Sequence, residues 1–255
     1  MKTAIIILLL PLSIFGVTRT RDIPITSMAT LVDGALSCAY GGEPVAFMQE
    51  GAAGYKSRIV LTFNNLSDYI PAGSILVSAS LRLYNLKPPV PMFPQTDSTA
   101  LIIYNIYNET AQDPLEVPEW AYRTNWAHQG TGPDSLPNWT NNISTLSWFI
   151  AGCGKNGSDT DGVANVSTDT AWVKPSDTNS WVELNLNVAD VDTIWKEEGA
   201  AYPNYYGWVI YSSETTDKKW GARKFFATDH YETDATKRPV VRVVYSTILK
   251  NGFRK

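Results

Sequence analysis

Two alternating apolar runs around one polar turn constrain the fold of this chain more than any other feature. In the first run, SRIVLTF, Ile59, Leu61 and Phe63 occupy every second position. In residues 75–83 apolar side chains again take every second position, while serines and an arginine occupy the other face. The turn between the runs contains a proline and a glycine. Since successive side chains of a strand point to opposite faces, the pattern predicts two half-buried strands, with the apolar side chains of residues 75–83 on one buried face.

Further segments repeat this alternation. Loops rich in proline, glycine and asparagine separate them, and such loops end strands. Residues 187–199 differ, because their apolar side chains recur at helical spacing until Gly199 ends the pattern, so that one short helix is predicted there. The other predicted strands are residues 100–108, 146–150, 181–186, 206–213, 223–229 and 240–246.

The composition is typical of one large all-β domain. Of the 255 residues, 44% are hydrophobic, 12% aromatic and only 18% charged, and no low-complexity tract divides the chain. We expect a single antiparallel β-sandwich over residues 36–250, with a short helix and a loop-rich insert at about residues 109–180. The net charge of −4 excludes a basic surface for nucleic acid or for an anionic membrane.

The first residues have the pattern of a secretory leader. Residues 1–17 begin with a positive charge at Lys2 and continue with an apolar run from Ala4 to Leu12. A retained membrane anchor is the alternative, but the run is short for a bilayer and Pro11 interrupts it. We expect the leader to be removed, which predicts a secreted protein, extracellular or at the cell surface, with no membrane attachment.

Residues 18–35 have an extended character and form either an additional edge strand or a free N-terminal arm. The stretch DIPITSMATLV alternates, and an alternating segment of this kind is able to add a strand to the sheet of a neighbouring subunit. The apolar side chains of this candidate assembly arm are Ile23, Ile25, Met28 and Leu31.

Several residues carry the chemistry expected of an exported chain. Cys38 and Cys153 are its two cysteines, and they form either one disulfide or two free buried thiols. A disulfide would close a long loop and stabilise the fold by roughly 3–5 kcal/mol. N-glycan acceptor sequons are more numerous, and they predict exposed positions. They lie at Asn65, Asn108, Asn138, Asn142, Asn156 and Asn165.

Catalytic patterns are weak, so that we expect no enzyme activity. The two histidines, His128 and His230, have no nucleophilic serine motif beside them, and Asp229 precedes His230 in what would be a strand, where neighbours point to opposite faces. Carboxylates for glycoside hydrolysis are present, but the sequence does not pair them. No cofactor is expected. A weak calcium candidate at Asp159 and Asp161 lacks the first and last acids of a calcium loop, which favours a simple turn.

Tryptophans are the candidates for binding a polysaccharide, because a sugar ring packs on an exposed aromatic face. Trp181, Trp195 and Trp208 occupy core-like positions. Those in loop-like sequence include Trp148 and Trp172, and the four glycan-stacking candidates are Trp120, Trp126, Trp139 and Trp220.

Several of these segments together resemble one known family. Arg58 before IVLTF, the turn IPAGSI and the strand VSASLRLYNL resemble the start of the DNRLRE family of extracellular β-sandwich domains. The segments WAYRTNWAHQGTG, WVELNLNVADVDTIWKEEG, YYGWVIYSSE, ARKFFATDHY and RPVVRVVY are similar to its later parts, so that the resemblance spans about residues 29–246. It implies a jelly-roll-like sandwich that serves as a carbohydrate-binding or surface-structure module. The insert at 138–172 is longer than the family leads us to expect, and the N-terminal arm lies outside the resemblance.

Two functions follow as hypotheses. The first is a secreted, glycosylated structural protein, a surface or fibre subunit whose partners are further copies of itself, joined through the N-terminal strand, and covalent N-glycans. The second is a carbohydrate-binding module that holds a polysaccharide on loop tryptophans.

Overall fold

The structure is a computed structural model, and it describes residues 16–32, 40–41, 43–49, 56–63, 65–87, 97–107, 160–164, 171–198, 205–212 and 223–248. Antiparallel strands dominate these residues, and the predicted fold class, an all-β sandwich with one short helix, is confirmed. The elements are β1 (Gly16–Val32), β2 (Tyr40–Gly41), β3 (Val45–Met48), β4 (Ser57–Phe63), η1 (Leu66–Asp68), β5 (Ile75–Leu86), β6 (Thr99–Tyr107), β7 (Thr160–Ala164), β8 (Ala171–Val173), β9 (Ser180–Leu186), α2 (Val188–Glu197), β10 (Tyr205–Tyr211), β11 (Lys224–Ala227), η4 (Ala235–Lys237) and β12 (Val240–Ile248).

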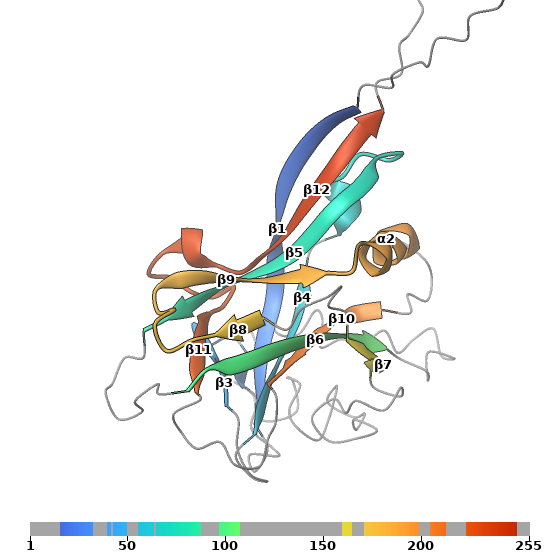
Figure 1. The fold of residues 1–255 in the computed structure, drawn as a ribbon. Coiled ribbons are helices and arrows are strands. Elements are labelled where there is room, and N and C mark those ends of the chain that lie inside the picture. The colour runs from blue at the N-terminus through green and yellow to red at the C-terminus, as the bar shows by residue number, and fades with distance from the viewer. Residues whose placement is uncertain are drawn as a thin grey trace, which may run out of the picture.

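The first strand joins two layers of sheet. Its residues 16–24 pair with β12, which continues to β5 and β9, whereas residues 25–32 pair with β4, which continues to β10 and β6. A register shift between Ile25 and Ser27 marks the crossing. In Figure 1, β5 and β9 lie on one side of the molecule and β6 and β10 on the other. The core therefore fills the space between these two layers.

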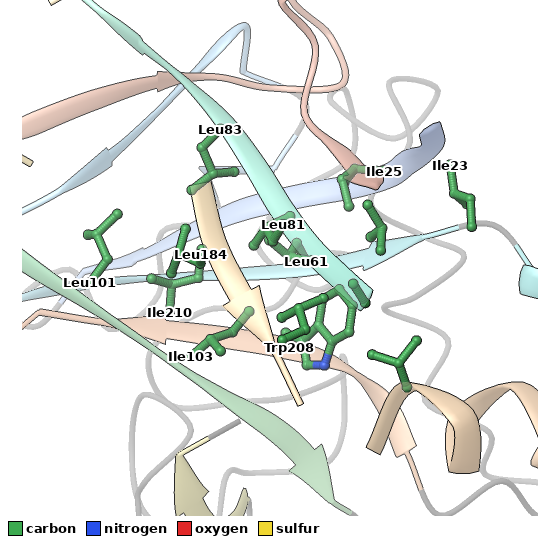
Figure 2. Packing of buried hydrophobic residues seen from close by; sticks show 14 of the residues in the cluster. Ile23, Ile25, Leu61, Leu81, Leu83, Leu101, Ile103, Leu184, Trp208 and Ile210 are labelled. Atoms are coloured by element: carbon green, nitrogen blue, oxygen red, sulfur yellow. The ribbon is translucent and has the colours of Figure 1, made fainter. Parts of the chain in front are cut away.

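Trp208 of β10 is at the centre of that core. Its side chain is fully buried, and its indole Nε1 donates a hydrogen bond to Asn105 Oδ1 at 2.9 Å. The ring stacks on Phe63 with centroids 4.5 Å apart. Figure 2 shows Trp208 beside leucines and isoleucines that come from both layers. The core position predicted for Trp208 is confirmed, with its one polar atom paired as burial requires.

The predicted alternation of β5 is wrong at its start. Ile75 and Val77 were expected on the buried face, but they are 58% and 54% exposed, while Leu76 is 7% exposed. The cause is a register shift in the pairing with β12 between Val244 and Tyr245, beyond which Tyr245 opposes Leu76. A bulge of this kind reverses which side chains face the core, because the period of a strand is two.

The N-terminal segment is part of the sandwich in this structure and not a free arm. All four side chains proposed as the assembly arm are packed in the chain's own core, with exposed fractions of 4% or less, namely Ile23, Ile25, Met28 and Leu31. The strand alternative is the one observed, and residues 18–32 pair with strands of both layers of the sandwich. Residues 16–22, by contrast, are all exposed.

The predicted helix forms as α2, between β9 and β10. Asn187 is its N-cap, and the side-chain oxygen accepts a hydrogen bond from the Ala189 amide at 2.9 Å. At the other end the Glu198 carboxylate accepts hydrogen bonds from the backbone amides of Leu66 and Ser67, the latter at 2.7 Å. These contacts fix α2 against η1. Over the described residues, no helix has the length and apolar character needed to cross a membrane.

The predicted insert at residues 109–180 is described only in its last part. β7 and β8 lie within it, and both pair with β6. The predicted short strand at residues 146–150 lies outside the described residues.

Candidate functional site

Three strands run side by side from the core to an exposed end of the molecule. We call residues 16–24 of β1, all of β12 and residues 75–82 of β5 the ribbon, and Figure 1 shows its strands rising side by side from the body of the molecule. Apolar side chains remain exposed on it, since Val17 is 41% exposed in addition to Ile75 and Val77. Val17 shares a face with Tyr245 and Leu76, whereas Ile75 opposes Ser246 on the other face, so these side chains do not form one patch.

One margin of the ribbon is the unpaired edge of β1. Along residues 16–24, the described part of the chain places a strand on the β12 side only. The amide of Ile25 donates to the Pro239 carbonyl at 3.3 Å, and the carbonyl of Val17 accepts from the Thr247 hydroxyl at 3.4 Å. Both odd-numbered residues thus direct their backbone groups toward β12. Because the backbone direction alternates along an antiparallel strand, the even-numbered residues direct theirs to the open edge.

Charges on β1 are unevenly paired. Asp22 accepts two hydrogen bonds from Arg242 of β12, Nε to Oδ1 and Nη2 to Oδ2, both at 2.7 Å. These hydrogen bonds hold the pKa of Asp22 below its ordinary value. Arg19 and Arg21 are exposed and form no ion pair with any other described residue. The open edge therefore carries two cations without an anionic partner in the described part of the chain.

A groove lies where β5 begins, between η1 and α2. Its volume is about 780 Å³, and Trp195 of α2 forms part of its wall, half-buried against the core. We call it the α2 groove. Most of its lining is apolar, contributed by Ile70, Ala72, Ile75, Leu76, Val188 and Trp195.

The α2 wall of this groove carries one acidic and one basic side chain, Asp192 and Lys196. Asp192 lines the groove and forms an ion pair with Lys196, one turn further along the helix. Asp190 lies in the first turn of α2, where burial raises its pKa. Residues 188–198 contain four acidic residues and one lysine, so that the segment has a net negative charge.

The groove lies beside the second margin of the ribbon. β9 pairs with β5 from Ala79 onward and ends at Leu186, after which the chain turns into α2. Residues 75–78 of β5 consequently have β12 on one side and, among the described residues, no strand on the other. Ile75 and Leu76 of this stretch also line the groove. An unpaired strand edge and an apolar groove are thus adjacent.

Asp229 and His230 form a contact that the sequence pattern does not predict. They follow β11 in a turn and not in a strand, so that both side chains point the same way and His230 Nε2 lies 3.2 Å from Asp229 Oδ2. Burial raises the pKa of Asp229, while the imidazole opposes that change. The Thr228 hydroxyl donates to the Glu43 carbonyl at 2.6 Å. The hydroxyl proton of Thr228 therefore points away from the imidazole of His230. The Asp229–His230 pair consequently does not activate Thr228 as a nucleophile.

Few of the sequence-predicted site residues are described. Asn65 is exposed, and its side chain makes no capping hydrogen bond to η1, as an accessible sequon requires. Among the tryptophans, Trp172 of β8 is 55% exposed, and Trp181 is half-buried beneath Arg82, whose guanidinium carbon lies 4.6 Å from the ring centroid. Outside the described residues lie the other sequons, both cysteines and the four glycan-stacking candidates: Asn108, Asn138, Asn142, Asn156, Asn165, Cys38, Cys153, Trp120, Trp126, Trp139 and Trp220.

The calcium candidate is also only partly described. Asp161 lies in β7, whereas Asp159 lies outside the described residues. Within the residues that the structure describes, no group of three or more histidine, cysteine, aspartate or glutamate side chains is arranged to hold a metal ion.

Comparison with known proteins adds no family, since no family model matches the sequence and no curated protein matches it. The resemblance to DNRLRE domains therefore stays an expectation from the sequence.

Proposed function

We propose that this chain is a secreted, glycosylated, non-enzymatic structural protein, a surface or fibre subunit that joins further copies of itself by strand addition at β1. The open edge of residues 16–24 is the observation that carries the proposal. An unpaired edge offers backbone donors and acceptors to another chain, and natural sheets usually cover or interrupt such edges. The leader pattern and the sequons support export and glycosylation.

The buried half of β1 changes how the assembly works. Ile23, Ile25, Met28 and Leu31 are core side chains, so donating them to a neighbour would open the sandwich of the donor. Addition at the exposed half leaves that core intact, because residues 16–22 contribute little to it. The subunit therefore joins its neighbour edge to edge, without exchanging a strand.

Thr20→Pro tests this proposal. Thr20 is even-numbered, so its amide faces the open edge, and proline removes that donor while leaving the pairing with β12 in place. Thr20→Ala is the matched control, because it retains the amide. We expect polymers of the secreted protein and of Thr20→Ala in negative-stain electron microscopy, and monomers of Thr20→Pro with an unchanged circular dichroism spectrum.

Intact mass before and after enzymatic deglycosylation completes the test. We expect a loss of mass from material secreted by a glycosylating host. Monodisperse, unglycosylated particles of the natural chain would contradict the structural proposal.

The exposed Trp172 favours carbohydrate binding as a second candidate function. Its ring is 55% exposed on β8, a strand held by pairing with β6, and an exposed indole at a fixed position is able to stack on a sugar. On a polysaccharide array, this function predicts that the chain retains a ligand which Trp172→Ala loses. Trp208→Phe would not be a suitable control, because Trp208 lies in the core; Lys174→Ala, at a neighbouring exposed position, is the appropriate one.

A further inference from the structure

We propose that the α2 groove is the acceptor site for the exposed half of β1 from a second copy of this chain. The inference rests on the proposed assembly and deepens it, because it names the surface that receives the open edge. Three observations support it: an unpaired backbone edge, an apolar lining and a complementary charge.

The first observation is the unpaired backbone edge of β5. β9 ends opposite Ala79, and residues 75–78 of β5 have no strand on that side within the described part of the chain. A strand placed there would continue the sheet in the position that β9 vacates when the chain turns into α2. The free amides and carbonyls of β5 would then be paired, as they are along the rest of the strand.

The lining matches the side chains that β1 would bring. Val17, Arg19 and Arg21 lie on one face of β1, since side chains two residues apart share a face. Across the ribbon, Arg19 opposes Tyr245, which in turn opposes Leu76, a residue of the groove lining. In a sheet that continues from one copy to the next, the same face of the incoming β1 is on the groove side. The aliphatic stems of Arg19 and Arg21, which remain after removal of the predicted leader (residues 1–17), then lie along the apolar lining.

Charge complements this fit. Arg19 and Arg21 have no ion-pair partner among the described residues of their own chain, whereas Asp192 of α2 lines the groove and residues 188–198 carry a net negative charge. Charges on an edge strand oppose unspecific pairing, and two cations restrict the edge to an acidic partner. The surface therefore selects another copy of the chain over an arbitrary strand.

The positions of the donor and acceptor surfaces determine the symmetry of the assembly. The donor edge belongs to β1 and the acceptor to β5 with α2, on opposite margins of the same ribbon. Two different surfaces make a heterologous contact, which each added copy repeats with a new neighbour. The expected product is an open filament and not a closed dimer.

A synthetic peptide with the sequence of residues 18–24, TRTRDIP, tests the groove directly. Added to Thr20→Pro, which keeps an empty acceptor and does not polymerise, a labelled peptide should bind with a rise in fluorescence anisotropy. A peptide with both arginines replaced by glutamate should bind about tenfold more weakly or not at all. Binding should also weaken as salt is raised, since exposed charges are screened.

A charge exchange locates the contact. The variant Arg19→Glu/Arg21→Glu should fail to polymerise alone, and so should Asp192→Lys, whereas their mixture should co-assemble. Asp192→Asn is the milder variant if reversal at the start of α2 disturbs the helix, and its peptide affinity should fall. Lys174→Glu, an exposed charge reversal away from the groove, should leave assembly and peptide binding unchanged.

The outcomes separate the two proposals. Polymers that are lost in Thr20→Pro but unaffected by the α2 variants would retain the structural function and overturn the groove as its acceptor. Absence of both polymers and peptide binding would overturn both.

Discussion

At the scale of single residues, one ion pair joins the two ends of the described chain. Asp22 and Arg242 are 220 positions apart in sequence, yet they face each other across β1 and β12 with two hydrogen bonds. The pair lies in the ribbon, with side chains 41% and 34% exposed, so that water and salt screen it. Its contribution to stability is consequently small, but it is placed where the ribbon leaves the core.

Asp22→Asn tests that contribution through its pH dependence. The pKa of Asp22 is lower in the folded chain than its ordinary value of 3.8, because the Arg242 guanidinium donates to the carboxylate. A carboxyl group of this kind stabilises the fold above its unfolded pKa, and the stabilisation is lost as the pH falls through the folded pKa. We expect Asp22→Asn to lower the free energy of unfolding by about 0.5 kcal/mol at pH 7.

Urea unfolding at a series of pH values measures this difference. The wild-type protein and Asp22→Asn should converge as the pH falls below about 4, where the carboxyl group begins to protonate in the unfolded chain. A difference that persists unchanged at low pH would show that the substitution acts through packing and not through charge.

At the scale of elements, the boundary between β9 and α2 creates the groove. Asn187 ends the strand and begins the helix, and its side chain satisfies the otherwise unpaired amide of Ala189. If the helix began later, the α2 wall would not stand beside the start of β5.

Asn187→Ala tests the importance of this cap. Loss of the N-cap hydrogen bond should lower the free energy of unfolding by about 1 kcal/mol. Asn185→Ala, two residues earlier and exposed on β9, is the control and should change it by less than about 0.5 kcal/mol. Thermal unfolding followed by circular dichroism gives both values. Equal effects of the two substitutions would argue against a capping role.

Local pattern predicted most of these elements, and contacts between distant residues decided the rest. The strand at residues 181–186 and the helix after it follow from side-chain periods of two and of 3.6, which the sequence displays directly. The bulge that exposes Ile75 depends on the register with β12, which no window of the sequence contains. The groove likewise needs η1 and α2 together, and the Glu198 contact that joins them spans 131 positions.

The tryptophans show the same limit of prediction from side-chain periodicity. All three predicted for the core alternate or recur like core residues, yet only Trp208 is fully buried. Trp195 is half-buried in the wall of the α2 groove, and Trp181 lies beneath the guanidinium of Arg82. Periodicity predicts which side of an element is apolar, but the amount of protein covering that side depends on neighbours far along the chain.

At the scale of the whole molecule, the sandwich depends on one strand that belongs to both layers. β1 supplies residues 25–32 to the layer of β4 and residues 16–24 to the layer of β12. The two layers are thus linked by continuous backbone as well as by the core between them. A subunit joined to others at β1 would transmit a pull along the assembly directly into both of its sheets.

The pairing of β1 with β12 also affects the order in which the strands pair during folding. A ribosome or an export channel delivers a chain from its N-terminus, and β1 emerges long before the strand that it must pair with. Residues 25–32 of β1 are able to pair with β4 early, whereas residues 16–24 wait for β12 at residues 240–248, a loop closure that slows folding. We therefore expect the layer of β4 to form first and the pairing of β1 with β12 to complete the sandwich.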